Sequence, residues 1–229
     1  HLIIISEYLE FNNQNLEIDV SLHIGSFIAV IVFFRKDIFN FIHNKDLFLK
    51  IVVGSIPVMI AGYILVKFNL IEQVRSIKVI GWTTLLFGIL LFISDKCEVQ
   101  KKIESNFTIK SAILIGLFQI ISLIPGVSRA GITITGARFL KFSRYDAAKI
   151  SFLLSIPTLA AVSFFGLNNL IQSNNFEFSL LMIAAVLLSF FFSLITINFF
   201  LKFIKNFSLN IFVIYRVILG AVILLVSYL

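Results

Sequence analysis

The sequence is poor in charge and in cysteine. Only 14% of its 229 residues are Asp, Glu, Lys or Arg, and Cys97 is its single cysteine. One thiol can form neither an internal disulfide nor a cysteine metal cluster, so both kinds of site are excluded. Hydrophobic residues make up 59% of the chain, against roughly 45–50% in a soluble domain. With a mean hydropathy of +1.02, the chain is predicted to be an integral membrane protein.

The apolar residues form near-continuous runs rather than alternating with polar ones. Such runs fit the roughly 20 residues that a helix needs to cross a bilayer, whereas barrel strands alternate over about 10 residues. The runs of spanning length lie at about 20–34, 51–66, 78–94, 150–167, 178–201 and 210–228. We therefore predict an all-α polytopic membrane protein, with six transmembrane helices in a single transmembrane domain that covers residues 1–229.

The basic residues indicate which side of the membrane each loop faces. Fourteen of the 19 Lys and Arg lie in four short segments, 35–50, 95–110, 138–149 and 202–205, and positively charged short loops stay in the cytoplasm. Residues 1–19 contain neither Lys nor Arg and are predicted to be external. Because these loops account for most of the net charge of +7, no nucleic-acid partner is expected.

Two shorter apolar legs, at about 111–124 and 127–138, interrupt the series of full spans. Both flanking segments, 95–110 and 138–149, are basic, so the pair must enter and leave the membrane on the cytoplasmic side. Legs of this length reach roughly 20 Å at ~1.5 Å per residue, short of a hydrocarbon core about 30 Å thick. We predict a re-entrant helical hairpin whose tip, residues 125–129, lies near the middle of the membrane.

The predicted tip carries the most unusual polar residues of the chain. A charged side chain within a bilayer costs several kcal/mol unless it is paired or faces a polar cavity, and Arg129 is such a residue. Its guanidinium fork suits phosphate oxygens, and Ser128 and Thr133 add hydroxyl groups. Gly126 and Gly131 allow an anion or another backbone to approach closely. These residues, at a helix N-terminus, predict an anion site; the alternative is that Arg129 pairs with a carboxylate or a helix C-terminus to lock the fold.

Two further features of the apolar runs concern the fold. Residues 55–61 (SIPVMIA) resemble residues 155–161 (SIPTLAA), although short repeated words in apolar sequence also arise by chance. A repeat suits the membrane plan in which broken helices from two halves meet at the midplane, so an internal inverted repeat is part of the predicted fold. Pro57 and Pro157 are interpreted as helix kinks. Arg216 lies near the cytoplasmic third of its apolar run, from which its side chain could reach the membrane surface, and a structural role is favoured for it.

Several short motifs resemble one known family of membrane enzymes. The motifs are GLFQ at 116–119, PGVSRAGIT at 125–133, SRY at 143–145, SFLLSIP at 151–157, LHIGS at 22–26, FRK at 34–36, GSIP at 54–57 and YR at 215–216. Together they are similar to the undecaprenyl-diphosphate phosphatases linked to bacitracin resistance. The resemblance extends over essentially the whole chain, and the motif at 125–133 is the most specific.

The family carries a second signature in an N-terminal re-entrant hairpin. There, a glutamate-rich helix leads through Pro, two Ser and a His that is followed by Leu. Only His1 and Leu2 match this signature in the present sequence. The resemblance therefore implies that most of an N-terminal hairpin is missing before residue 1, and that the chain without it can be inactive.

The resemblance implies a reaction and a site. The reaction is hydrolysis of undecaprenyl diphosphate to undecaprenyl phosphate and phosphate, which recycles the lipid carrier for cell-wall synthesis. The implied catalytic residues are His1, Arg129 and Ser128, and the implied substrate-binding residues are Gly126, Gly131 and Thr133. A divalent cation, Mg²⁺ or Ca²⁺, is expected as a cofactor, but the family's glutamates that would bind it are absent from this chain.

The family also implies a location and partners. We expect a multi-pass protein of the bacterial inner membrane, with an active site open toward the outer face. The expected partners are the bilayer, a polyprenyl diphosphate lipid and a second copy of the chain in a homodimer. An alternative is a secondary transporter or flippase of a prenyl phosphate or another anion, because a carrier can use the same hairpin without breaking a bond. A purely structural membrane subunit is a further alternative.

Overall fold

The structure is a computed structural model that describes residues 16–40, 45–68, 70, 76–172 and 180–229. Within these residues the regular structure is helical, apart from one isolated bridge between Lys101 and Phe142. The helices are α2 (Leu16–Phe33), α3 (Arg35–Asn40), α4 (Lys45–Lys67), α6 (Ile77–Asp95), α7 (Ile103–Asn106), α8 (Ile109–Ile120), the short 3₁₀ helix η1 (Ile121–Leu123), α9 (Arg129–Phe139), α10 (Arg144–Gln172), α11 (Leu180–Asn206) and α12 (Asn210–Tyr228). The predicted all-α class is confirmed.

Five of the described helices are long and apolar enough to cross a membrane, namely α4, α6, α10, α11 and α12. They coincide with five of the six predicted spans. The sixth predicted span, 20–34, falls in α2, whose 18 residues include Glu17 and Asp19 in the first turn and which is not one of the five. Large apolar side chains such as Phe192 and Ile195 of α11 are exposed, as a lipid-facing surface requires. The chain is therefore a multi-pass membrane protein with five to six spans.

The chain divides into two compact units, each described here by itself. The first comprises His1–Asn40 and Ile156–Phe199, and the second comprises Phe41–Ser155 and Phe200–Leu229. In the first unit, Val20 of α2 packs with Leu170 and Met182 in a small buried cluster. In the same unit, the hydroxyl of Ser26 lies 3.0 Å from that of Ser189. The single domain predicted from the sequence stays a prediction.

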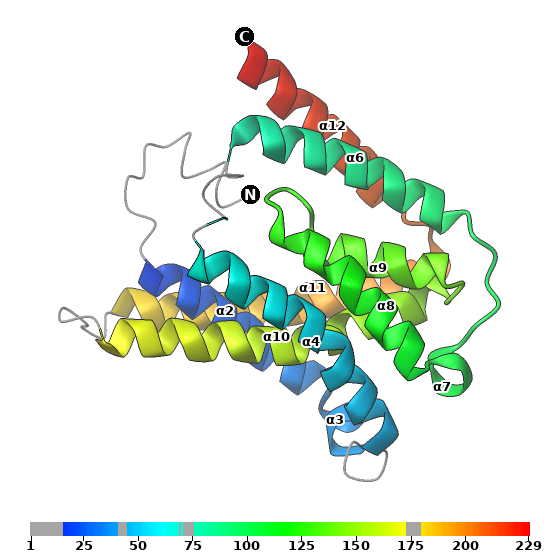
Figure 1. The fold of residues 1–229 in the computed structure, drawn as a ribbon, viewed down its shortest axis with the longest axis horizontal. Helices are drawn as coiled ribbons and strands as arrows, with labels where there is room; N and C mark the ends of the chain where they lie inside the picture. Colours follow the sequence, from blue (N-terminus) through cyan, green and yellow to red (C-terminus); the bar gives the residue numbers. More distant parts are fainter. Residues whose placement is uncertain (1–15, 41–44, 69, 71–75, 173–179) are drawn as a thin grey trace. The chain divides into compact units, whose positions relative to one another are not determined.

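The second unit contains the hairpin that the sequence predicts. Helices α8 and α9 have 12 and 11 residues, and they lie side by side with a tight loop between them (Figure 1). The segment before α8 is hydrogen-bonded to the segment after α9, because the amides of Gln100 and Lys101 donate to the carbonyl of Lys141 over 3.0 and 3.1 Å. The amide of Ser143 returns a bond of 3.3 Å to the carbonyl of Lys101. The two legs thus begin and end at one place, as a hairpin requires.

Helix α9 ends in a turn that directs the chain back to this paired base. Lys141 adopts φ 70°, the left-handed conformation that usually follows a helix C-terminus. The amide of Lys141 donates to the carbonyl of Arg138 over 2.8 Å, and that of Phe142 donates to the carbonyl of Ala137 over 3.1 Å. These two bonds make a Schellman motif, which satisfies carbonyls that the end of the helix leaves without partners.

Small residues bring the helices of the second unit close to the hairpin. A Cβ at Gly116 of α8 would lie 1.9 Å from the carbonyl oxygen of Gly54 in α4, so these two helices touch backbone to backbone. Helix α6 packs along α12 in the same way (Figure 1). A Cβ at Gly220 of α12 would lie 2.9 Å from the Cβ of Leu85 in α6. Helices in membranes commonly approach through such small residues, because lipid provides little hydrophobic driving force between them.

The two similar segments that suggested a repeat, 55–61 and 155–161, both lie inside helices. Pro57 is within α4 and Pro157 within α10, where each removes one backbone hydrogen bond. The hydroxyl of Ser55, which is fully buried, donates to the carbonyl of Ile51 over 2.9 Å or to that of Leu154 over 3.1 Å. The inverted repeat stays a prediction.

Candidate active site

The loop between α8 and α9 forms the tip of the hairpin, and Gly126 sets its shape. Gly126 has φ +89°, a conformation that side chains other than glycine's rarely tolerate. A Cβ at this position would lie 2.2 Å from Oγ1 of Thr83 and 2.7 Å from the carbonyl oxygen of Ile80. Glycine is therefore required both by the backbone conformation and by the close approach of α6.

The carbonyl groups of the tip are held by side chains from two other helices. From α6, Oγ1 of Thr83 donates to the carbonyl of Pro125 over 2.6 Å, and Oγ1 of Thr84 donates to that of Gly126 over 3.3 Å. From α12, Nη2 of Arg216 donates to the same Gly126 carbonyl over 3.1 Å. Three donors thus fix a loop that has no regular structure of its own.

Ser128 begins the second leg of the hairpin. It is the N-cap of α9, and its Oγ accepts a hydrogen bond from the amide of Gly131 over 3.2 Å. The Gly131 amide uses one acceptor position on Oγ of Ser128. The hydroxyl proton of Ser128 can therefore be donated to another group. Ser128 is exposed, so this proton is accessible at the positive end of the α9 dipole.

Arg129 is the first residue of α9 and is half-buried. Its backbone therefore directly follows Ser128 at the start of this helix. Gly131 lies one turn inside, where a Cβ would be 3.3 Å from Oγ of Ser128 and 3.7 Å from Nη1 of Arg216. The structure thus brings four predicted site residues, Gly126, Ser128, Arg129 and Gly131, into one loop and the helix turn that follows it.

Thr133 occupies a different environment from these four. It is 1% exposed, and its hydroxyl lies 2.6 Å from that of Ser151 in α10. The same hydroxyl also lies 2.8 Å from the carbonyl of Arg129. In the structure Thr133 joins α9 to the first part of α10, and its predicted contact with substrate stays a prediction.

Arg216 is a further residue that contacts the tip. The structural role predicted for it agrees with the structure, in which its guanidinium donates to the Gly126 carbonyl rather than reaching the membrane surface. Its Nε is buried with no hydrogen-bond partner among the described residues. The signal was in the sequence: an arginine within an apolar run is as costly as Arg129 and requires the same explanation.

The remaining predictions about the site concern His1 and a cation. His1 lies outside the residues that the structure describes. Among the described residues, no group of three or more His, Cys, Asp or Glu side chains is arranged to hold a metal ion. The described part of the chain therefore offers no ligand set for Mg²⁺ or Ca²⁺, which prefer several oxygen ligands.

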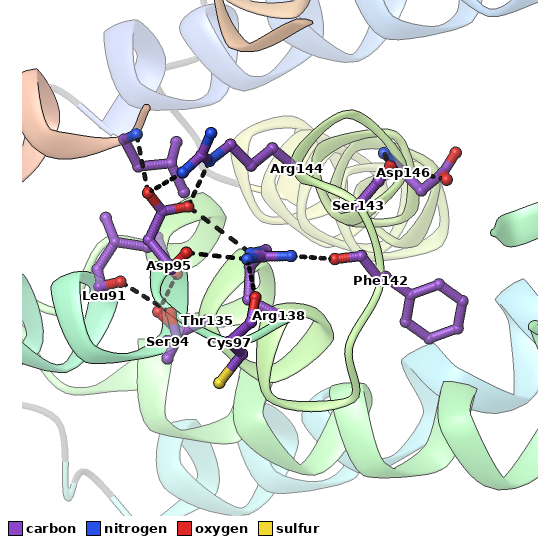
Figure 2. Close-up of polar contacts among 12 residues, drawn as sticks. Leu91, Ser94, Asp95, Cys97, Thr135, Arg138, Phe142, Ser143, Arg144 and Asp146 are labelled. Carbon is purple, nitrogen blue, oxygen red and sulfur yellow. Dashed lines mark hydrogen bonds and ion pairs between the residues drawn. The ribbon is translucent and has the colours of Figure 1, made fainter. Parts of the chain in front are cut away.

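A second polar cluster holds the base of the hairpin (Figure 2). The carboxylate of Asp95, the last residue of α6, accepts two hydrogen bonds from Arg144, of 2.7 Å from Nε and 2.9 Å from Nη2. Arg138 of α9 donates to the backbone carbonyls of Asp95, Cys97 and Phe142 over 2.9, 2.6 and 2.5 Å. The cluster therefore joins the ends of α6 and α9 to the start of α10.

Arg138 is a charged residue whose side chain is almost completely buried. It is 1% exposed, and its Nε lies 3.6 Å from Oδ1 of Asp95. Burial lowers the pKa of Arg138 from its ordinary value, and the Asp95 carboxylate opposes this by raising it. A buried pair of this kind is stable only while both partners are present.

Comparison with known proteins identifies the family of this chain. The family model described as Bacitracin resistance protein BacA matches residues 1–222. The chain is 47% identical over 229 residues to the undecaprenyl-diphosphatase of Pelagibacter ubique (strain HTCC1062), in a match that covers 100% of this chain and 89% of that protein. It is 37% identical over 241 residues to the undecaprenyl-diphosphatase of Roseobacter denitrificans (strain ATCC 33942 / OCh 114), covering 100% and 90%. The chain belongs to the BacA bacitracin-resistance family.

Proposed function

We propose that this chain hydrolyses undecaprenyl diphosphate to undecaprenyl phosphate and inorganic phosphate. Relatives named undecaprenyl-diphosphatase match all of the chain at 47% and 37% identity, and their family model matches residues 1–222. The structural observation that carries the proposal is the tip of the hairpin, where Arg129 and the exposed hydroxyl of Ser128 begin α9. A guanidinium, a hydroxyl and a helix N-terminus together suit a phosphate group.

The proposed roles follow from the charge of the diphosphate. The Arg129 guanidinium and the Ser128 hydroxyl donate to oxygens of the terminal phosphate. A nucleophile adds to the terminal phosphorus in line with the bridging oxygen, the bond from phosphorus to that oxygen breaks, and undecaprenyl phosphate leaves with the electron pair. A water nucleophile loses its proton and gives inorganic phosphate directly, whereas a phosphoryl group on His1 is released as inorganic phosphate when water cleaves the phosphorus–nitrogen bond. Donors fixed before the reaction stabilise the negative charge on the transferred group. Arg216 acts as a positioning residue, since it holds the Gly126 carbonyl.

The nucleophile and the cation enter the proposal only through family resemblance. His1 is proposed as nucleophile or as general acid or base, because an imidazole ordinarily titrates near neutral pH. Mg²⁺ or Ca²⁺ is proposed as a cofactor held by glutamates of the family's N-terminal signature. The described residues provide no such ligand set.

The proposed location is the bacterial inner membrane, with the diphosphate site open to the outer face. The support is the charge of the segments at the base of the hairpin: 95–110 and 138–149 each contain four Lys or Arg, which favours the cytoplasm. The tip then extends away from the cytoplasm. The prenyl tail lies against the exposed apolar side chains of the spanning helices, and this arrangement keeps it out of water.

The test is a direct assay of bond cleavage. The full-length gene product, purified in detergent, is supplied with undecaprenyl diphosphate, and the released phosphate and the lipid product are measured. We expect one phosphate for each undecaprenyl phosphate formed. If the protein instead moves intact prenyl phosphate across vesicle bilayers and releases no phosphate, the transporter interpretation replaces this proposal.

A further inference from the structure

A cavity opens at the base of the hairpin, and the proposed reaction makes no use of it. Its volume is about 510 Å³, and its lining includes three cationic side chains: Arg138, Arg144 and Lys205. Asp95 is the single carboxylate among the lining residues, which also include Tyr145. One negative charge against three positive charges leaves the cavity with an excess of two positive charges.

Asp95, the carboxylate already included in this balance, is committed to protein groups. Its two carboxylate oxygens accept from Nε and Nη2 of Arg144. One of them also accepts from the amide of Leu209 over 3.3 Å. The carboxylate is 4% exposed, so it is held within the wall of the cavity. Its effect is to hold Arg144 in place and to face Arg138 across 3.6 Å, while Lys205 forms no ion pair with a described residue.

Several donors around the cavity have no partner in the described part of the chain. Arg144 uses Nε and Nη2 on Asp95, and its Nη1 makes no hydrogen bond with a described residue. Lys205 lies with Nζ 4.7 Å from the centre of the Tyr145 ring, and it forms neither a hydrogen bond nor an ion pair with any described residue. Arg138 is not one of these donors, because its Nη atoms donate to backbone carbonyls and its Nε faces Asp95. A guanidinium fork and an ammonium group placed together in this way suit the oxygens of a phosphate.

The cavity also lies where helices end. Asp95 is the last residue of α6, Arg144 is the first of α10, and Lys205 is in the last turn of α11. The ends of spanning helices lie at the level of the lipid head groups. The loop charges assign this end to the cytoplasm, where membranes carry anionic lipids and where basic pockets between helices bind their head groups.

We propose that this cavity binds a phosphate-bearing anion, and that the phosphate of an anionic phospholipid head group is the occupant that its position favours. The anion contacts Nη1 of Arg144 and Nζ of Lys205, with the hydroxyl of Tyr145 as a further donor. This site is at the opposite end of the hairpin from Arg129. The inference does not rest on the proposed hydrolysis, and it holds whichever reaction the tip performs.

The test uses the detergent-purified chain and three probes at constant ionic strength. The probes are short-chain phosphatidylglycerol, phosphatidylcholine with the same acyl chains, and inorganic phosphate, and the readout is the midpoint of thermal unfolding during titration. Lys205→Gln removes a cation of the cavity. Lys202→Gln is the matched control, because Lys202 is exposed on the same helix end and is not among the lining residues. Tyr145→Phe removes the hydroxyl and keeps the ring.

We expect phosphatidylglycerol, and not phosphatidylcholine, to raise the midpoint to a plateau. Half-saturation should require about fivefold more phosphatidylglycerol in Lys205→Gln, the effect of one basic residue near an anionic head group, and should be unchanged in Lys202→Gln. If inorganic phosphate gives the same plateau with the same dependence on Lys205, the site stands and its occupant is a soluble phosphate. Equal half-saturation in Lys205→Gln and Lys202→Gln, or no plateau with any probe, overturns the proposal.

Discussion

Nη2 of Arg216 lies 3.1 Å from the carbonyl oxygen of Gly126, so the last helix of the chain holds the tip of a hairpin 90 residues earlier. The hairpin cannot fix this tip alone, because its loop has no regular structure. Thr83 and Thr84 of α6 hold the same loop from the neighbouring helix. The position of Arg129 at the start of α9 thus depends on α6 and α12 as well as on the hairpin itself.

The first prediction concerns this contact. A hydrogen bond that involves a charged group contributes about 1.5–3 kcal/mol, so Arg216→Gln should lower kcat/KM for phosphate release by about tenfold to hundredfold, at ~1.4 kcal/mol for each factor of ten. Arg216→Lys keeps the charge and should recover part of the loss. The measurement is steady-state phosphate release together with the thermal midpoint. An Arg216→Gln protein with unchanged kcat/KM contradicts the positioning role.

The second prediction concerns the shape of the tip. Gly126→Ala places a Cβ in a left-handed conformation, which costs roughly 1–2 kcal/mol. It also brings this Cβ to 2.2 Å from Oγ1 of Thr83, so the loop must move. We expect at least a loss of about tenfold in kcat, in line with ~1.4 kcal/mol for each factor of ten.

Gly62→Ala is the matched control for this change. Gly62 lies inside α4, and the nearest atom to its Cβ would be 3.9 Å away. Alanine is a better helix former than glycine by roughly 1 kcal/mol, so this variant should be as active as the wild type and no less stable. Equal activity of the two alanine variants would mean that the tip tolerates a displaced loop.

The third prediction concerns the base of the hairpin. Asp95→Asn removes the carboxylate that Arg144 and Arg138 share and leaves the enclosed guanidinium of Arg138 and the partly exposed one of Arg144 without it. Loss of one partner from a buried ion pair costs about 3–5 kcal/mol, and the thermal midpoint in detergent should fall steeply. The control is Asp46→Asn, which breaks the exposed pair with Lys50 on α4. Exposed pairs contribute at most about 1 kcal/mol, so comparable destabilisation of both variants contradicts this account of the cluster.

The fourth prediction concerns topology. In a Cys97→Ser background, a cysteine at Asn106 should react with a membrane-impermeant reagent only from the cytoplasmic side, because it lies between the basic loop residues 95–110. A cysteine at Leu229 should react only from the outside, because α12 follows the basic segment 202–205, which is predicted to be cytoplasmic, and is long enough to cross the membrane. In intact cells only the cysteine at position 229 should be labelled, and in opened membranes both cysteines should be labelled. Reaction of both positions from one side contradicts the assignment of the loops.

The spans and the hairpin could be predicted because they depend on local composition. Apolar runs set the helices, and the basic segments 95–110 and 138–149 required both legs to return to one side. The hydrogen bonds between Lys101 and the segment after α9 agree with that argument. The start of α9 at Arg129 was also predictable, because serine is a preferred N-cap and Ser128 precedes it.

The contacts that hold the site could not be predicted from the sequence. Arg216 reaches Gly126 across 90 residues, and no local pattern indicates which distant carbonyl an arginine will meet. In the sequence, Asp95 is one charged residue at the end of an apolar run, and nothing near it indicates a partner. The fold places Arg144, 49 residues later, beside it. Thr133 shares a helix with Arg129, but the neighbour opposite its hydroxyl, Ser151, is a matter of tertiary packing.

The most direct test of the central claim is phosphate release from undecaprenyl diphosphate by full-length Arg129→Ala protein, compared with wild type and with Arg35→Ala. Arg35 is an exposed arginine of α3 whose Nη1 donates to the carbonyl of Val32, so it controls for loss of an arginine as such. If Arg129 stabilises the phosphoryl group, kcat should fall about hundredfold to thousandfold, as when one fixed donor to a developing charge is removed. Arg35→Ala should retain wild-type activity. Undiminished release by Arg129→Ala would contradict the assignment of the hairpin tip as the active site.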